Sequence, residues 1–317
     1  MTTPGTAAHV SHVAAAAAAV RRGPRAHRHR LLVRPVLAED RPVVEDLLRD
    51  SEAPGAEAWI AGMWDRWLRS AGSLLAVAET EEGISALSVT TLVSRSEAYL
   101  HCFRARPRHY FLVAYHRLFL FGIAWALTRG RSVVRWAINR ERFGRFEAGL
   151  SELFEGRVLP AGSFGYWDAD PLPDVDYRLL PRERDRELSN LWSSKDRSRT
   201  LWAPYWYWRR LTWADLVKEL RLDRVLHDGD ARAMFIQAPL GPYLLWAEGP
   251  PDELTACARM FRGYAAARGD RPRALLPNTP DIDEALAQAG FVRRATYSIY
   301  ETPLTPDALL TFGRALS

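Results

Sequence analysis

From Leu31 onward, apolar and polar residues follow two kinds of spacing along the chain, and these predict strands and helices in alternation. Short apolar runs bounded by turn residues indicate strands. Apolar residues three and four positions apart, behind an acidic first turn, indicate helices. In chain order the pattern predicts a strand (31–37), two helices (38–53 and 56–72), two strands around a turn (73–95), a strand (97–107), a helix (about 110–128), a strand (131–138), a helix (139–154) and two short strands (158–170).

A similar series follows in the second half of the chain. The repeated order predicts two related α/β units, residues 31–170 and 171–317, and a chain of 317 residues exceeds the size at which one core normally stops growing. The second series consists of an opening segment (176–192), a helix (205–220), three strands (223–249), a helix (251–269), a strand (273–277), a helix (281–290) and a strand (291–302).

A long apolar run at residues 104–130, flanked by basic clusters, raises the question of a membrane span. A span needs about 20 apolar residues, whereas His116 and Arg117 lie near the middle of this run. The run also follows a strand, which would be unpaired in lipid. The sequence therefore predicts a buried helix on a sheet and no contact with a membrane. The side chains expected against the sheet are Leu118, Phe121 and Trp125.

The remaining composition bears on the terminus, the compartment and the partners. Residues 1–30 place an alanine run before a basic cluster, the reverse of a secretory signal, and are predicted to be a disordered tail. Cys102 and Cys257 form neither a disulfide framework nor a metal-binding pair, so we expect a cytoplasmic protein without a metal. The net charge of +5, mostly from arginine, suits phosphate, CoA or RNA, although a GC-rich codon bias would enrich arginine equally.

The order of elements in residues 31–170 resembles the GNAT acyltransferase superfamily. In the second half, the stretch PNTPDIDEALAQAGF at residues 277–291 resembles the closing strand, helix and Gly-Phe step of that family. Gly290 is expected to cap this helix before Phe291 enters the core. The resemblance implies an α/β fold of the mixed (α+β) kind, with two tandem GNAT-like domains, each a mixed, mostly antiparallel sheet flanked by helices.

The resemblance also implies acetyl-CoA or another acyl-CoA as cofactor. In the family, a glycine-rich turn after the fourth strand and the start of the next helix hold the CoA pyrophosphate, because free amides and the helix dipole attract a polyanion. Here the turn reads RPRHYFLVAY, with bulky residues at the small positions, so we expect weak binding. In the second half Pro250 and Pro251 remove two amides. The residues implied in cofactor binding are Arg104, Ala105, Arg106, Arg108, His109, Tyr110 and Asn139.

GNAT enzymes often use a glutamate on or near the fourth strand as general base and a tyrosine after the fifth strand as general acid. Glu97 and His101, four residues apart on one strand face, and Glu248 in the second half are the candidates for catalysis. Phe146 and Ala285 stand at the two tyrosine positions, so neither offers a phenol. Each candidate also has an alternative role. Glu97 could lie in the turn that enters the strand, His101 could be a hydrogen-bonded core or surface residue, and Glu248 could cap the next helix.

An aromatic run at residues 202–213, WAPYWYWRRLTW, predicts either a substrate pocket lined by Tyr205, Trp206 and Trp208 or the interface between the two halves. Three functions remain open. The first is an acyl-CoA-dependent N-acyltransferase acting on an amine of a small molecule or peptide. The second is an aminoacyl-tRNA-dependent transferase of the Fem type, since a basic chain suits tRNA phosphates. The third is a non-catalytic binding or sensor protein with this fold.

Overall fold

The computed structural model has the predicted α/β fold, and contacts between residues divide the chain into two compact units. The first unit comprises Met1–Trp136, Arg145–Leu159 and Tyr300–Ser317, and the second comprises Ala137–Gly144 and Pro160–Ile299. The two domains predicted as residues 31–170 and 171–317 stay a prediction, and the predicted tail lies outside the described residues. The structure describes residues 31–49, 65–105, 111–141, 158–181, 201–204, 207–238 and 241–305.

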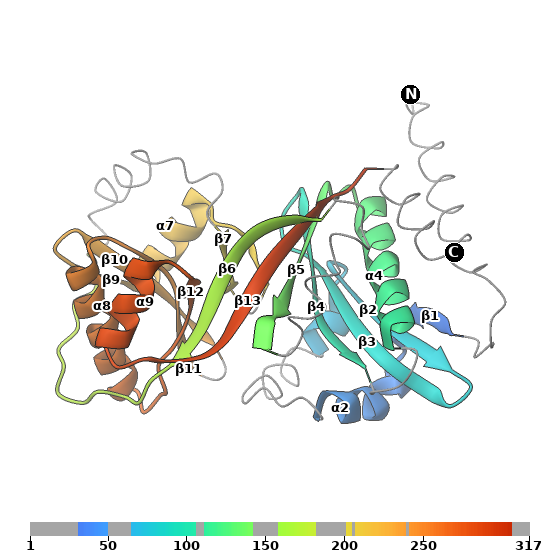
Figure 1. Ribbon diagram of the computed structural model, residues 1–317, viewed down its shortest axis with the longest axis horizontal. Coiled ribbons are helices and arrows are strands. Elements are labelled where there is room, and N and C mark those ends of the chain that lie inside the picture. Colours follow the sequence, from blue (N-terminus) through green and yellow to red (C-terminus); the bar gives the residue numbers. More distant parts are fainter. Residues whose placement is uncertain are drawn as a thin grey trace. The chain divides into compact units, whose positions relative to one another are not determined.

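The first unit is built on a mixed, mostly antiparallel sheet (Figure 1). In order along the sheet, the strands are β1 (Leu32–Pro35), β2 (Ser73–Thr80), β3 (Gly83–Leu92), β4 (Glu97–Ala105) and β5 (Val133–Asn139). Neighbouring strands pair antiparallel from β1 to β4, whereas β4 and β5 are parallel. The helix predicted at residues 38–53 is found as a 3-10 turn, η1 (Ala38–Asp40), followed by α2 (Arg41–Arg49).

Helix α4 (Phe111–Thr128) confirms the prediction for the apolar run. It contacts β2, β3 and β4, and it lies across these strands in Figure 1. Leu118 is fully buried in a cluster with β2 side chains, and Phe121 and Trp125 pack against the same cluster. The helix ends where Gly130 adopts a φ of 72° and its N–H donates to the carbonyl of Leu127. Within the described part of the chain, no helix is long and apolar enough to cross a membrane.

The close approach of α4 to the sheet depends on a helical glycine. A Cβ at Gly122 would clash with the hydroxyl of Thr90 on β3 and come within 3.0 Å of Leu100 Cδ1 on β4. Glycine in a helix interior costs about 1 kcal/mol relative to alanine, so this position is chosen for packing rather than for helix formation. Gly122 therefore allows α4 to pack closely on β3 and β4.

The second unit contains helices α8 (Pro251–Ala266) and α9 (Pro280–Gln288), and its strands continue the strand order beyond β5. Strand β13 (Val292–Pro303) belongs to the second unit up to Ile299 and to the first unit from Tyr300. Two short strands, β7 (Leu201–Trp202) and β8 (Arg209–Arg210), pair separately. Next to β13, the order along the sheet is β6 (Leu159–Asp168), β12 (Arg273–Pro277), β11 (Gly241–Glu248), β10 (Ala231–Ala238) and β9 (Val225–Asp228).

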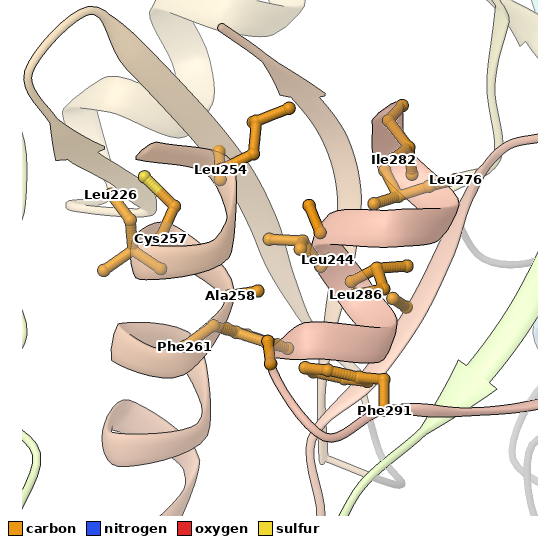
Figure 2. Packing of buried hydrophobic residues seen from close by; sticks show 14 of the residues in the cluster. Leu226, Leu244, Leu254, Cys257, Ala258, Phe261, Leu276, Ile282, Leu286 and Phe291 are labelled. Atoms are coloured by element: carbon orange, nitrogen blue, oxygen red, sulfur yellow. The ribbon is translucent and has the colours of Figure 1, made fainter. Parts of the chain in front are cut away.

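Figure 2 shows the core of this unit, where apolar side chains of α8 and α9 meet those of the sheet. Phe261 of α8 is fully buried, and Leu244 of β11 is 1% exposed. After α9, Gly290 has a φ of 83° and the N–H of Phe291 donates to the carbonyl of Leu286 (2.9 Å). The predicted glycine cap is therefore confirmed, and Phe291 enters the core behind it.

Two predicted elements differ from those observed. The two short strands predicted at residues 158–170 form the single strand β6. The helix predicted at residues 205–220 begins only at Trp213, as α7 (Trp213–Arg221). Its start is set by Thr212, whose side chain accepts from the N–H of Asp215, while Asp215 accepts from the N–H of Thr212. Because α7 begins at this reciprocal cap, Arg209 and Arg210 are not part of the helix and form β8 instead.

Candidate active site

The parallel strands β4 and β5 separate partway along their length. Among the described residues, their pairing starts at Glu97 and Val133 and ends at Leu100 and Trp136, although β4 runs on to Ala105. Beyond Leu100, β4 therefore continues without β5 as its paired neighbour. An extended ligand chain can pair with a strand at such an edge.

A β-bulge lies in β4 just beyond this point. Leu87 of β3 is opposite Arg104, whereas Val89 is opposite His101, so three steps along β4 match two steps along β3. A bulge of this kind leaves one residue out of the ladder and turns its backbone groups away from the neighbouring strand. The bulge and the separation of β4 from β5 together define the candidate active site of the first unit.

The second unit repeats this geometry. The parallel strands β11 and β12 pair only at Tyr243 with Arg273 and at Leu244 with Ala274 among the described residues. The register between β10 and β11 shifts immediately afterwards, because Phe235 is opposite Leu244 while its neighbour Met234 is opposite Trp246. Both units therefore carry a bulged strand that parts from its parallel neighbour, and both strands lead into a long helix.

The helix after the bulged strand of the second unit is unsuited to an anion. Pro250 and Pro251 at its start have no N–H to donate. Asp252 and Glu253 occupy its first turn, so their charges already interact with the helix dipole and would repel a phosphate. Glu253 also accepts from the backbone N–H groups of Asp230 (2.7 Å) and Ala231 (2.9 Å). The start of α8 is thus occupied by the protein's own carboxylates.

Helix α4 of the first unit has no acidic residue in its first turn. Three of the residues predicted to contact the cofactor lie among the described residues. Arg104 lies in β4 opposite Leu87, and Ala105 lies opposite Ala86 and packs on the α4 core cluster. Asn139 is the last residue of β5. The other predicted cofactor contacts lie outside the described residues, namely Arg106, Arg108, His109 and Tyr110.

Glu97 begins β4, and its carboxylate forms an ion pair with Arg135 of β5. Arg135 Nη1 lies 2.8 Å from Glu97 Oε1, and the Arg135 side chain is 1% exposed. Arg135 Nε also donates to Glu301 Oε2 on β13 (3.0 Å). Glu97 therefore stands at the paired end of the two strands, four residues before His101. Its predicted role as general base stays a prediction.

His101 lies on β4 directly after the last residue paired with β5. Its side chain is buried, with Nε2 3.0 Å from Thr91 Oγ1 and the ring 5.0 Å from that of Trp67. Burial lowers the pKa of His101 to about 3, so the imidazole is neutral at pH 7. Of the two candidates on this strand, His101 is the one placed at the strand separation.

Glu248 ends β11, opposite Arg232 of β10 and one residue before Gly249. Trp208, predicted as a substrate contact or as part of the interface between halves, is 2% exposed and packs within the second unit. Its ring lies 5.8 Å from that of Phe164 and 5.7 Å from that of Tyr297. Both predicted roles of Trp208 stay predictions. The other two predicted substrate contacts, Tyr205 and Trp206, lie outside the described residues.

Sequence reasoning missed Arg135, which holds Glu97 in place. One signal was present, because a charged residue inside the apolar run VVRWAI is almost never fully buried unless it is paired. The identity of its partner Glu301 was not readable, since the two residues are 166 positions apart. No cluster of three or more metal-ligating side chains occurs among the residues that the structure describes.

Sequence comparison finds no protein-family model and no curated protein that matches this chain. Comparison of structures does find similar folds. A GCN5-related N-acetyltransferase from Sphaerobacter thermophilus matches with a TM-score of 0.61 at 12% identity, over 87% of this chain and 96% of that chain. A tandem GNAT protein from the clavulanic acid biosynthesis pathway matches with a TM-score of 0.51 at 13% identity, over 86% of this chain and 98% of that one. The protein therefore has a tandem GNAT-like fold.

Proposed function

We propose that the protein is an acyl-CoA-dependent N-acyltransferase whose catalytic half is the first unit. The observation that carries this proposal is the bulged strand β4, which parts from β5 after Leu100 and Trp136 and leads into α4. The edge of β4 beyond Leu100, where β5 is no longer its paired neighbour, suits the amide-bearing arm of an acyl-CoA, which needs hydrogen-bond partners along its length. The fold similarity to acetyltransferases supports the same assignment by analogy.

The CoA pyrophosphate is proposed to bind at the start of α4, near Arg106 and Arg108. The helix dipole and the two guanidinium groups favour a polyanion there. The start of α8 in the second unit offers the opposite conditions, with Pro250 and Pro251 lacking N–H groups and carboxylates in the first turn. One CoA per chain is therefore expected. Because acyl-CoA is an intracellular metabolite, we propose a cytoplasmic site of action.

The proposed reaction transfers the acyl group from sulfur to nitrogen. The amine of a small molecule or peptide attacks the thioester carbonyl, the new C–N bond forms, and the C–S bond breaks. The proton lost by nitrogen ends on the CoA sulfur, so the step balances without a further reactant. His101 stands at the strand separation and is proposed to orient the amine as a neutral hydrogen-bonding group, because a pKa of about 3 makes its imidazole too weak a base to accept the proton. Glu97 is proposed to act through its ion pair with Arg135 rather than as the base.

Calorimetric titration with CoA and acetyl-CoA tests the proposal directly. The double variant Arg106→Ala/Arg108→Ala should weaken CoA binding at least tenfold while leaving the melting temperature unchanged, since charge-assisted contacts to phosphate contribute about 1.5–3 kcal/mol each. A matched control is Arg221→Ala/Arg268→Ala, which removes two exposed guanidinium groups in the second unit and should bind CoA like the parent. A stoichiometry of two CoA per chain, or no binding at millimolar CoA, would contradict the proposal.

The same titration distinguishes the other functions. A chain that does not bind CoA but binds an aminoacyl-tRNA with an affinity that depends on salt would be a tRNA-dependent transferase. Neither of the two compared structures is described as acting on tRNA. A chain that binds CoA but transfers no acyl group to any amine in a broad panel would be a binding or sensor protein.

A further inference from the structure

Two surface loops at one end of the first unit carry three arginines. Residues 94–96 lead into β4, and residues 129–132 connect α4 to β5. Their sequences are SRS and RGRS, so neither loop contains an acidic residue. Arg95 and Arg129 are exposed, whereas Arg131 is partly buried. These three residues are called the arginine cluster below.

Hydrogen bonds hold the two loops together. Arg131 Nη1 donates to the carbonyl of Arg95 on the other loop (2.9 Å) and to the carbonyl of Arg129 (2.9 Å). Ser132 donates to the carbonyl of Ser96 through its N–H (2.9 Å) and through its hydroxyl (3.2 Å). One guanidinium therefore contacts the backbone of both other arginines, and the three residues belong to a single hydrogen-bonded surface.

No carboxylate forms an ion pair with the arginine cluster within the described part of the chain. Elsewhere in the same unit arginines do have such partners, and Arg34 forms ion pairs with Asp40 (2.6 Å) and Glu79 (2.7 Å). The acidic residue nearest to the first loop is Glu97, whose carboxylate pairs with Arg135 instead (2.8 Å). The positive charges of the cluster are therefore not neutralised by a paired carboxylate.

Stabilisation of the C-terminal end of α4 explains part of this arrangement. Cations interact favourably with that end of a helix dipole, and Arg129 and Arg131 follow the last turn of α4. The end of a helix carries only about half an elementary charge, which cannot offset three guanidinium groups. Arg129 also lies over the ring of Trp125 (5.6 Å to the centre), a contact that holds the guanidinium without neutralising it. Arg95 belongs to the other loop, so the helix end does not account for it.

We propose that the arginine cluster binds the phosphoryl group of a small phosphorylated molecule. Guanidinium groups are donors only, and their paired N–H groups match phosphate oxygens. A phosphomonoester offers three terminal oxygens and a charge of about −1.5 to −2 near neutral pH, so it suits three cations better than a carboxylate does. Ser94 Oγ already accepts from the N–H groups of Ser96 and Glu97, which leaves its proton to donate to the ligand.

This site is separate from the CoA site proposed above. The CoA pyrophosphate is assigned to the start of α4, whereas the arginine cluster lies at its end. Helix α4 has 18 residues and is therefore about 27 Å long. Nucleic acid is the main alternative occupant, but its diester phosphates carry one charge each and bind along an extended surface. A cluster confined to two loops suits a single phosphoryl group better.

Two probes of similar shape and different charge test the proposal. Phenyl phosphate and benzenesulfonate are titrated by calorimetry into the full-length variant Arg106→Ala/Arg108→Ala, which lacks the arginines proposed to bind CoA. Phenyl phosphate should bind with one molecule per chain and about tenfold or more tighter than benzenesulfonate, since it carries the greater charge. No saturable binding, equal affinities of the two probes, or displacement of phenyl phosphate by a lower concentration of a short RNA would each overturn the proposal. The measurement involves no acyl transfer, so it stands or fails separately from the proposed enzymatic function.

Substitutions in the same background locate the binding. Adding Arg95→Gln/Arg129→Gln removes two charges but keeps Arg131, whose side chain joins the loops, and should weaken phenyl phosphate binding about tenfold or more. Adding Arg221→Gln/Arg268→Gln is the matched control, because it removes the same charge from exposed positions of the second unit and should leave the affinity unchanged. Melting curves verify that both variants are folded at the temperature of the titration. Equal affinities in the Arg95→Gln/Arg129→Gln variant and its background, or an equal loss in the control, would refute the site.

Discussion

Arg135 Nη1 and Glu97 Oε1 lie 2.8 Å apart between two parallel strands, with both side chains almost fully buried. Removing one partner of a buried pair leaves an uncompensated charge, which typically costs about 3–5 kcal/mol. Because Glu301 still compensates Arg135, we expect Glu97→Gln to lower the free energy of unfolding by about 3 kcal/mol, measured by urea denaturation. The exposed pair of Arg41 and Glu45 provides the control, and Glu45→Gln should leave stability nearly unchanged.

The same variant separates structural and catalytic roles of Glu97. If Glu97 acts through its ion pair, Glu97→Gln/Arg135→Met should recover part of the lost stability, because the only charge of the three that remains is that of Glu301, whose side chain is 24% exposed rather than fully buried. Acyl transfer measured well below the melting temperature should survive in the double variant. A single variant that is as stable as the parent yet inactive would instead identify Glu97 as the base.

His101 makes stability depend on pH in a predictable direction. Its pKa is about 3 in the folded chain and about 6.5 when unfolded, so between these values the unfolded chain binds more protons. The free energy of unfolding should therefore fall as pH falls below 6.5, by up to about 1.4 kcal/mol per pH unit. Burial also lowers the pKa of His116, which adds a contribution of the same sign.

Denaturation between pH 7 and pH 5 isolates the histidine effect, because Asp40, whose pKa is lowered mainly by its bond from Arg34, loses its contribution only at lower pH. His101→Gln should flatten most of the slope in this window. A slope unaffected by His101→Gln would show that the imidazole binds a proton as readily in the folded chain as in the unfolded chain.

Gly122 is expected to tolerate no side chain while Thr90 retains its hydroxyl. Gly122→Ala gains about 1 kcal/mol of helix propensity, but overpacking costs about 1–3 kcal/mol, so a net loss of stability is expected. Thr90→Ala/Gly122→Ala removes the clashing hydroxyl, which has no hydrogen-bond partner among the described residues, and should recover the loss. Gly162→Ala, where the nearest side-chain atom is 3.6 Å away, serves as the control for urea denaturation. Equal stability of the parent and Gly122→Ala would mean that α4 can shift off the sheet.

Asp215 fixes the hairpin that precedes α7. Arg209 donates to both carboxylate oxygens at 2.7 and 2.6 Å, and its guanidinium lies 4.9 Å from the centre of the Trp202 ring. Burial alone would raise the pKa of Asp215, but the bonds from Arg209 and Thr212 outweigh it and lower the pKa. Stability from this carboxylate is therefore present at neutral pH and lost as pH falls through its folded pKa.

Asp215→Ala should cost about 1–2 kcal/mol through the lost cap and bidentate pair. Hydrogen exchange should rise at residues 207–213 before it rises in the sheet. Asp252→Ala, a change in the first turn of α8, is the control and should leave exchange in the hairpin unchanged. Uniform exchange over the whole second unit would argue instead for a global loss of stability.

The sequence predicted secondary structure correctly where residues close together in the chain determine it. The apolar run with two basic flanks became α4, and the glycine after α9 became its cap, because each signal lies within a few residues of its effect. The aromatic stretch before α7 was predicted as helix and is partly strand. In this stretch, the pairing of β7 with β8 and the cap at Thr212 outweigh the helical spacing of the apolar residues. The spacing alone does not reveal either interaction.

The alternation of strands and helices, the interior position of α4 and the resemblance to a tandem GNAT fold could all be predicted from the sequence, because apolar spacing and turn residues act locally. The tertiary structure was needed to show where β4 leaves β5 and which carboxylates compensate Arg135. Such features depend on residues far apart in the chain, such as Arg135 and Glu301. Their charges interact only after the strands have paired, so no short segment of the sequence contains the information.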